Sequence, residues 1–190
     1  MTSHALSHRV PCRAFRFEER YLERKLLAGR LEADGVPAGP EWGRLQKGED
    51  VTLADGRVVR SDDYTVIPRP PRRLVVAGDN DTPGLLAEAC QDAHVLVHEA
   101  TYTQDVADRV GPWPQHSSAR QVGQFAQRVG LPYLVLTHFS SRYQFSGDRG
   151  PVIGNLADEA RAAYSGGLHL ARDFLRLRLG RDLCLEVLDA

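Results

Sequence analysis

The sequence predicts an α/β fold, in which a sheet is covered by helices. From residue 74 onward, short apolar runs alternate with stretches whose apolar residues recur at helical spacing. Alternating elements of this length are typical of a layered α/β sheet. The runs that we expect to form strands are Leu74 to Ala77, Val95 to Val97 and Tyr133 to Leu136. The expected helices lie near Gly84 to Gln91 and from Ser118 to Val129, and leucines alternating with arginines predict a half-exposed strand at Leu175, Leu177 and Leu179.

The region before residue 68 differs in composition. From Arg13 to Ile67 it is polar and irregular, with little apolar content for a core of its own. We expect a charged helix from Glu18 to Leu31 and a hairpin whose turn is Asp55-Gly56. The proline-rich segment from Pro68 to Arg73 is typical of a stiff connector. The expected divisions of the chain are therefore residues 1–17, 18–67 and 68–190.

Charge and composition exclude several classes of protein. The 190 residues carry 24 basic and 25 acidic side chains, a formal net charge of -1. This balance excludes nucleic-acid binding through overall charge and leaves only a local basic patch. No apolar run reaches the roughly 20 residues that span a bilayer, and the first residues lack the apolar core of a signal peptide. We expect a cytoplasmic protein with no membrane partner, and cysteines at Cys12, Cys90 and Cys184 are too widely separated to indicate a disulfide framework or a cysteine zinc site.

Polar side chains that carry chemistry follow the apolar runs. Asp79 follows the first run, His98 and Glu99 follow the second, and His138 follows the third. Each residue alone is typical of a turn, a cap or the surface, but the carboxyl ends of successive strands meet at one edge of a sheet, which favours a joint site. His116 precedes a predicted helix, and His8 follows a short apolar stretch. Imidazole and carboxylate without thiolate favour zinc or manganese, while the remaining histidines near strands, His94 and His169, are interpreted as structural.

These residues and their order resemble the ribonuclease Z family, the tRNA 3′-processing endonucleases of the metallo-β-lactamase superfamily. The resemblance runs from about Leu6 to the end of the chain and rests on ordered motifs with a Gly-Pro segment in the correct place. The similar segments are Leu6 to Val10, Phe15 to Glu19, Val36 to Pro40, Gly48 to Arg57, Gly78-Asp79, His98 to Thr101, His116-Ser117 and Thr137 to Tyr143.

The resemblance implies a fold and a catalytic site. The fold would be the second half of the αββα sandwich of that superfamily, with residues 1–17 and 68–190 in its core. In the complete family site there are two zinc ions. By position, His8 would ligate one ion, His138 the other, and Asp79 would bridge both. His116 would then protonate the departing ribose oxygen, oriented by Glu99.

The resemblance also implies partners. Residues 18–67 would form a flexible, protruding arm that binds precursor tRNA, with Gly39 and Pro40 as its Gly-Pro motif, and the protein would be a homodimer. Between Val36 and Asp63, four basic residues face six acidic ones. An electrostatic grip on RNA is therefore disfavoured, and we expect shape and backbone amides to contribute more.

The sequence departs from the family at one important place. The HxHxDH motif, which supplies the other metal ligands and the general base, does not occur in the chain. One hypothesis is a zinc endonuclease in which HxHxDH comes from a preceding part of a longer product or from a companion chain. A second is a non-catalytic tRNA-binding remnant, and a third is another metallo-hydrolase, against which the Gly-Pro segment argues. If half of the sandwich is missing, one face of the sheet should expose apolar side chains.

Overall fold

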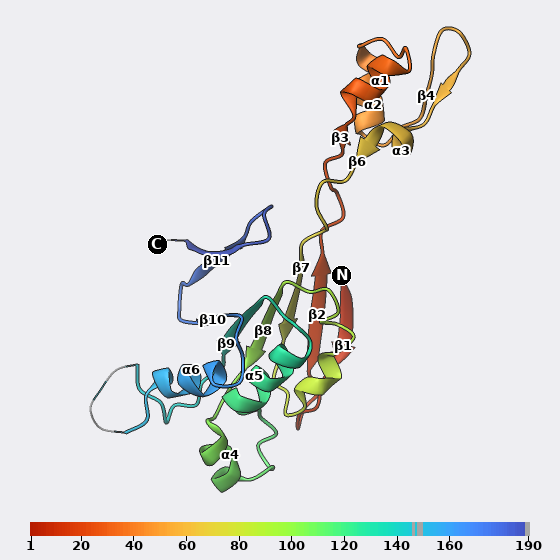
Figure 1. Cartoon of the computed structure of the whole chain (residues 1–190). Helices are drawn as coiled ribbons and strands as arrows, with labels where there is room; N and C mark the ends of the chain where they lie inside the picture. Colours follow the sequence, from red (N-terminus) through yellow and green to blue (C-terminus); the bar gives the residue numbers. More distant parts are fainter. Residues whose placement is uncertain (146, 148–149, 189–190) are drawn as a thin grey trace. The chain divides into compact units, whose positions relative to one another are not determined.

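A computed structural model describes residues 1–145, 147 and 150–188 (Figure 1). The chain forms two compact units. One contains Met1–Glu18 and the chain from Arg72 onward, and the other contains Glu19–Pro71. Each unit has its own cluster of buried apolar side chains.

The larger unit is built on a six-stranded sheet. Strands β7 to β10 are parallel, whereas β1, β2 and β7 pair antiparallel. The three strands predicted from the apolar runs are confirmed as β7, β8 and β9. The prediction of irregular structure is wrong for Arg13–Glu18. This segment forms a strand that pairs antiparallel with β7, and its side chains alternate between a more buried and a more exposed face of the sheet. In order across the sheet, the strands are β1 (Thr2–Ala5), β2 (Arg13–Glu18), β7 (Arg73–Ala77), β8 (Val95–Glu99), β9 (Tyr133–Thr137) and β10 (Gly167–Leu170).

The helix predicted from Ser118 to Val129 is confirmed as α5 (Ala119–Arg128). Its start is fixed by a capping box, because the Ser118 hydroxyl accepts a hydrogen bond from the Gln121 N–H while the Gln121 side chain accepts one from the Ser118 N–H. The helix predicted near Gly84 to Gln91 is wrong. Only a 3₁₀ turn, η1 (Pro83–Leu86), followed by irregular turns forms there, and Gly84 within it is a poor helix former. Two further helices are α4 (Gln104–Val110) and α6 (Ile153–Arg161), and no helix of the described residues is long and apolar enough to cross a membrane.

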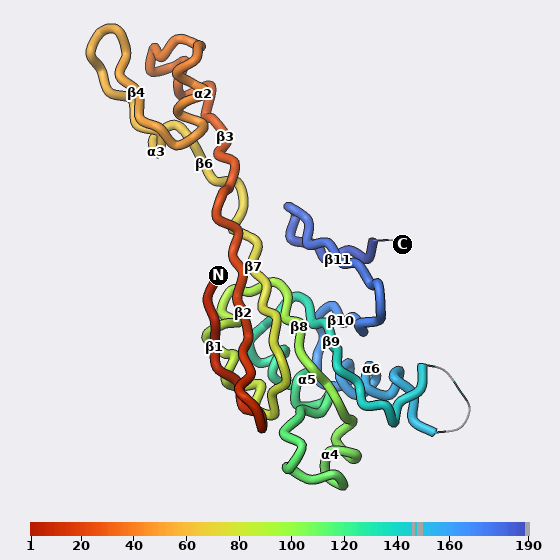
Figure 2. The backbone as a smooth tube through the Cα atoms, turned by 180° about the vertical axis from the view of Figure 1, so that it is seen from behind, coloured from red at the N-terminus to blue at the C-terminus, as the bar shows by residue number. Residues whose placement is uncertain are grey.

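Helices α5 and α6 cover one face of the sheet, as the two opposite views show (Figures 1 and 2). Gly123 of α5 lies so close to α6 that a Cβ atom there would meet the Ala160 carbonyl oxygen at 2.9 Å. Glycine is therefore required for this close packing of the two helices. The fully buried side chains of this layer are Val75, Leu96, Leu134, Leu136, Phe125 and Leu156.

The other face of β2 and β7 is apolar and open. Phe15 is 37% exposed, Phe17 41% and Val76 37%, although their neighbours Ala14 and Val75 are fully buried. Phe15 and Val76 are register partners, so they lie side by side on this face. The expected exposed apolar face is thus present at these residues.

The last described residues form a separate two-stranded antiparallel sheet. Strand β11 (Arg176–Leu179) pairs with β12 (Leu185–Leu188). In β11 the arginines are exposed and the leucines are half-buried. The half-exposed strand predicted from the alternating leucines is confirmed.

The smaller unit consists of short elements. The predicted hairpin is confirmed, since β4 and β5 pair on either side of Asp55-Gly56. The predicted helix from Glu18 to Leu31 is wrong, because Lys25 and Leu26 pair with β6 as a strand and the helix begins only at Ala28. In chain order the elements are β3 (Lys25–Leu26), α1 (Ala28–Ala33), α2 (Pro40–Gln46), β4 (Val51–Thr52), β5 (Val58–Val59), α3 (Ser61–Tyr64) and β6 (Thr65–Val66).

This unit has a core, contrary to our expectation. Apolar residues that are scattered along the sequence converge into one buried cluster, which sequence spacing alone did not reveal. Inside it, the Ser61 hydroxyl donates to the Leu45 carbonyl over 2.7 Å, which satisfies a buried polar group. The buried members are Leu31, Val36, Leu45, Val51 and Val59.

Because the two cores share no residue, they should unfold separately. We expect Leu45→Ala to destabilise the smaller unit by about 2–5 kcal/mol and to leave the larger unit unchanged. Phe125→Ala is the matched control, and it should destabilise the larger unit and leave the smaller unit unchanged. Hydrogen exchange read by mass spectrometry would report faster exchange in peptides from residues 25–66 or from residues 74–170, respectively. Equal acceleration of both regions by either variant would contradict two independent cores.

Candidate metal centre

Asp79 lies between two imidazoles at the carboxyl edge of the sheet. One carboxylate oxygen is 3.6 Å from His8 Nε2, and the other is 3.6 Å from His138 Nε2. Asp79 follows β7 and His138 follows β9, while His8 comes from the loop between β1 and β2. The parallel register of β7, β8 and β9 brings these ends to one edge.

Hydrogen bonds orient both imidazoles. His8 Nδ1 lies 2.9 Å from the Gln115 carbonyl oxygen, which can only accept, so Nδ1 carries the proton and Nε2 keeps its lone pair. The Thr101 hydroxyl lies 2.7 Å from Glu99 Oε2 and donates there, so its oxygen accepts from His138 Nδ1 over 3.0 Å. His138 also adopts a left-handed φ of 56°, a strained conformation of the kind found at functional sites. In the neutral form of both rings, Nε2 therefore faces Asp79 with its lone pair available to a metal.

Glu99 is buried and fully engaged. Its side chain is 1% exposed, and its Oε1 accepts from the Ser117 N–H over 2.8 Å. Oε2 accepts from the N–H and the hydroxyl of Thr101. His116 Nδ1 lies 3.2 Å from Oε1. The centroid of the His116 ring lies 5.0 Å from that of His8 and 5.1 Å from that of His138, with the rings tilted relative to each other. Glu99 thus fixes the orientation of His116 beside the two other imidazoles.

The donor set fits zinc. Two groups, His8 with Asp79 and His116, and Glu99 with His116 and His138, each place one ligand atom per residue within 4.8 Å of the others. A separation of 3.6 Å is too long for a hydrogen bond between Asp79 and an imidazole. Ligand atoms about 2.0–2.2 Å from one zinc ion in tetrahedral geometry lie roughly 3.4 Å apart, which is close to this separation.

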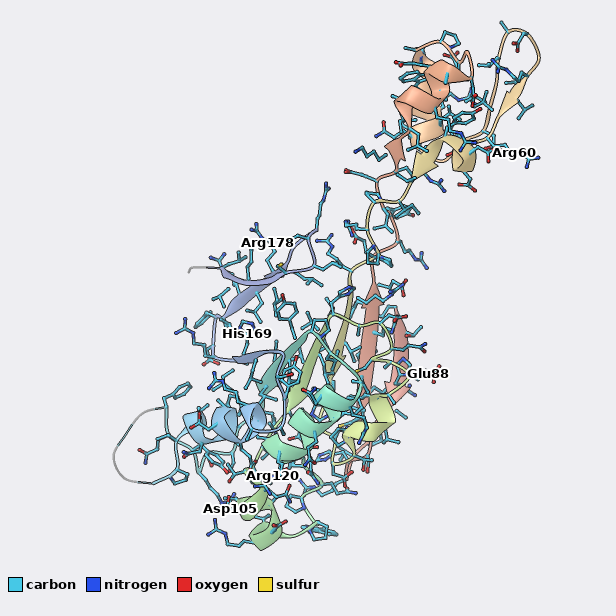
Figure 3. All side chains as sticks on the ribbon, viewed as in Figure 1. Arg60, Glu88, Asp105, Arg120, His169 and Arg178 are labelled. Atoms are coloured by element: carbon cyan, nitrogen blue, oxygen red, sulfur yellow. The ribbon has the colours of Figure 1, made fainter. Side chains whose placement is uncertain are left out.

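The structure thus brings together five of the predicted site residues: His8, Asp79, Glu99, His116 and His138. Gly39 and Pro40 lie in the smaller unit, where they begin helix α2. His94 lies at the start of β8 and its Nδ1 accepts from the Arg73 N–H. His169 lies on β10 (Figure 3), so both residues are outside the cluster.

Comparisons with known proteins identify the family. No protein-family model matches the chain. It is 63% identical over 189 residues to ribonuclease Z of Marinobacter nauticus (strain ATCC 700491 / DSM 11845 / VT8), covering 100% of this chain and 58% of that protein. It is 52% identical over 186 residues to ribonuclease Z of Pseudomonas putida (strain GB-1), covering 98% of this chain and 58% of that protein. The chain is a partial homologue of ribonuclease Z.

The comparison of structures supports the fold. The metallo-beta-lactamase fold protein YhfI from Bacillus subtilis superposes with a TM-score of 0.51 at 17% identity. The match covers 90% of this chain and 46% of YhfI. This ribonuclease Z homologue therefore has an α/β metallo-β-lactamase fold that corresponds to about half of such a protein, and it spans little more than half the length of the relatives that it matches.

One residue of the joint site predicted from the sequence has a different role. His98 is fully buried, with Nδ1 donating to the Glu99 carbonyl oxygen over 2.6 Å and Nε2 accepting from the Asn80 side chain over 3.1 Å. Burial lowers the pKa of His98, which keeps its imidazole neutral. Both ring nitrogens are hydrogen-bonded within the protein, so His98 holds Asn80 in place and does not offer a ligand atom next to Asp79.

Asn80 is the functional residue that sequence reasoning missed. The residue is fully buried, and its side-chain oxygen accepts from the N–H groups of Ser7 and Thr82 at 3.1 and 3.3 Å. Its carbonyl oxygen accepts from the Ser117 hydroxyl over 2.6 Å. Asn80 therefore joins the neighbours of His8, Asp79 and His116. Its position next to Asp79 is the signal in the sequence that could have found it.

Replacing Asn80 should loosen this edge of the sheet. Asn80→Ala leaves buried N–H groups and His98 Nε2 without partners. We expect the free energy of unfolding to fall by about 1–3 kcal/mol for each of these groups that water does not reach. Asn155→Ala is the control, because Asn155 accepts a single N–H at the exposed start of α6 and should cost about 1 kcal/mol. Urea unfolding would measure both values. An equal loss for the two variants would contradict the role assigned to Asn80.

Proposed function

We propose that this chain forms part of a zinc-dependent endonuclease site that removes the 3′ trailer from tRNA precursors. The observation that carries the proposal is Asp79, whose two carboxylate oxygens face different imidazoles at 3.6 Å. A carboxylate shared in this way suits a pair of ions such as those that serve phosphodiester hydrolysis. The homology to ribonuclease Z supports tRNA as the substrate class.

Each side chain of the cluster has a defined task in this proposal. Bound zinc would supply neutralisation of phosphate charge and a lowered pKa for an attacking water. His8, Asp79 and His138 would hold the metal. His116 donates a proton to the departing ribose oxygen, and Glu99 keeps its ring in position through the contact at Nδ1.

The site is incomplete without further ligands. The ligands His8, Asp79 and His138 provide fewer protein atoms than two zinc ions require, since each ion normally takes three or four. The HxHxDH motif that would supply the rest does not occur in the sequence. We infer that it comes from a longer product or a companion chain, and that the complementary half covers the apolar face of Phe15, Phe17 and Val76.

The smaller unit would bind the tRNA. Gly39 is the N-cap of α2 with extended backbone, and Pro40 occupies the first helical position, where its missing N–H costs nothing. With four basic and six acidic residues from Val36 to Asp63, this unit would recognise RNA through shape and backbone groups. The family resemblance further supports a homodimer in the cytoplasm.

A second candidate function is a non-catalytic tRNA-binding remnant. The specific observation in its favour is the absence of HxHxDH from the sequence. The two candidates can be distinguished by measurement. If the chain is part of the endonuclease, a complementary half restores zinc binding and cleavage. If it is a remnant, a complementary half restores neither.

The chain alone should hold zinc poorly. With three ligand residues for two ions, we expect weak binding of fewer than two zinc ions per chain. Equilibrium dialysis followed by elemental analysis measures the stoichiometry, and dialysis against a chelator should remove the metal readily. Two tightly held ions in the isolated chain would contradict an incomplete site.

Co-expression with a fragment that carries HxHxDH should restore zinc binding and 3′-end cleavage of precursor tRNA together, because one docking event completes both. In that complex Asp79→Ala should abolish cleavage. His116→Ala should keep the metal and slow cleavage by roughly 10² to 10⁴-fold, as expected for loss of a general acid. Asp158→Ala, a change on the exposed surface of α6, is the control and should leave the rate unchanged. Normal cleavage by Asp79→Ala, or failure of the fragments to associate, would favour the remnant.

A further inference from the structure

Trp113 is an exposed indole on the loop that leads to His116. The side chain is 79% exposed and lies three residues before His116. The sequence contains one other tryptophan, Trp42, which packs against the core of the smaller unit. A single exposed apolar side chain is common on protein surfaces. The position and the backbone of Trp113 are what distinguish it.

The backbone that carries Trp113 is constrained. Trp113 and Pro114 are the central residues of a turn closed by a hydrogen bond of 3.1 Å from the Gln115 N–H to the Pro112 carbonyl oxygen. Prolines on both sides of Trp113 restrict the turn further. The Gln115 carbonyl oxygen in turn holds His8 Nδ1 at 2.9 Å. The indole is therefore presented on a stiff turn that is bonded directly to the site, which reduces the entropy lost when a ligand stacks on it.

Pro112, the first residue of this turn, also lines a polar cavity. It has a volume of about 450 Å³, and Gly111, Pro112 and His116 form part of its wall. The polar groups that line it include the carboxylates of Asp81 and Asp108 and the amide of Gln104. Lysine and arginine are absent among the described residues that line it. Carboxylates repel phosphate and accept hydrogen bonds from amino groups, so the lining suits the edge of an amino-bearing base.

We propose that Trp113 and this cavity form a subsite for an unpaired nucleotide next to the bond that is cut. The indole stacks on a base, and the cavity accepts the exocyclic amino group of a base such as cytosine. The subsite rests on the proposed endonuclease function for its place in the reaction. Its ability to bind RNA, however, requires only the residues of this chain.

Fluorescence of the full chain tests the subsite. In a Trp42→Phe background, Trp113 is the sole tryptophan, so any change in tryptophan emission arises at Trp113. The probes are hexacytidylate and hexauridylate, which are both pyrimidine RNAs. Cytosine carries an amino group at C4 and an acceptor at N3, whereas uracil carries a carbonyl oxygen at C4 and an N–H at N3. We expect saturable quenching by both RNAs, with tighter binding of hexacytidylate. Asp108→Asn should reduce that preference and keep the quenching.

Binding measured by fluorescence anisotropy of end-labelled hexacytidylate extends the test to variants without the indole. Trp113→Ala should weaken binding about 5- to 150-fold, the range expected from loss of one stacked base. Trp113→Phe should restore most of the affinity, and Phe174→Ala, which removes another exposed aromatic side chain, should leave it unchanged. Absence of quenching, or equal affinity for Trp113→Ala and the parent, would overturn the proposal.

A further outcome would also overturn it: a shift of Trp113 emission on addition of an HxHxDH-carrying fragment, with no response to RNA, would assign the indole to a protein interface. The test separates the subsite from the proposed function. Quenching by RNA with no cleavage in the reconstituted complex would support the subsite and contradict the endonuclease. Cleavage that is unaffected by Trp113→Ala would support the endonuclease and contradict the subsite.

Discussion

The buried carboxylate of Glu99 is the interaction on which the site depends. It accepts hydrogen bonds from the backbone of Asn80, Thr101 and Ser117, and it contacts His116. A carboxylate at 1% exposure is stable only when such donors replace water. Since these donors belong to the loops after β7 and β8 and to the start of α5, the requirement to satisfy one charge brings three separate segments to the same point.

The features that could be predicted are those that depend on residues close together in the sequence. The apolar runs located β7, β8 and β9, and the polar residues at their ends located Asp79, Glu99 and His138. Burial depends on contacts distant in sequence, and it escaped prediction. His98 and Glu99 are the last two residues of β8 and both are buried, yet only Glu99 contacts His116, whereas His98 bonds to Asn80. The small core around Leu31 and Leu45 was missed for the same reason, because its members share no short spacing.

Two features of the larger unit are incomplete in the same sense. Asp79 and its two imidazoles form part of the zinc site that we propose, and Phe15 and Val76 leave one face of the sheet uncovered. Both agree with a homologue that spans 58% of the ribonuclease Z of Marinobacter nauticus. A sheet with helices on one face can fold around that layer, but apolar area left in water stays available for burial against another segment. We therefore expect this unit to fold without the segment that would complete the proposed site.

The most direct test of the account is nitrogen NMR of the histidine rings during a zinc titration. The hydrogen bonds to Gln115 and Thr101 place the protons of His8 and His138 on Nδ1, which leaves Nε2 to bind metal. We predict that Nε2 of both residues shifts as zinc is added, while His98 retains its resonances. Resonances of His8 and His138 that do not respond to millimolar zinc, or a response of His98 in their place, would contradict the assignment of the metal centre.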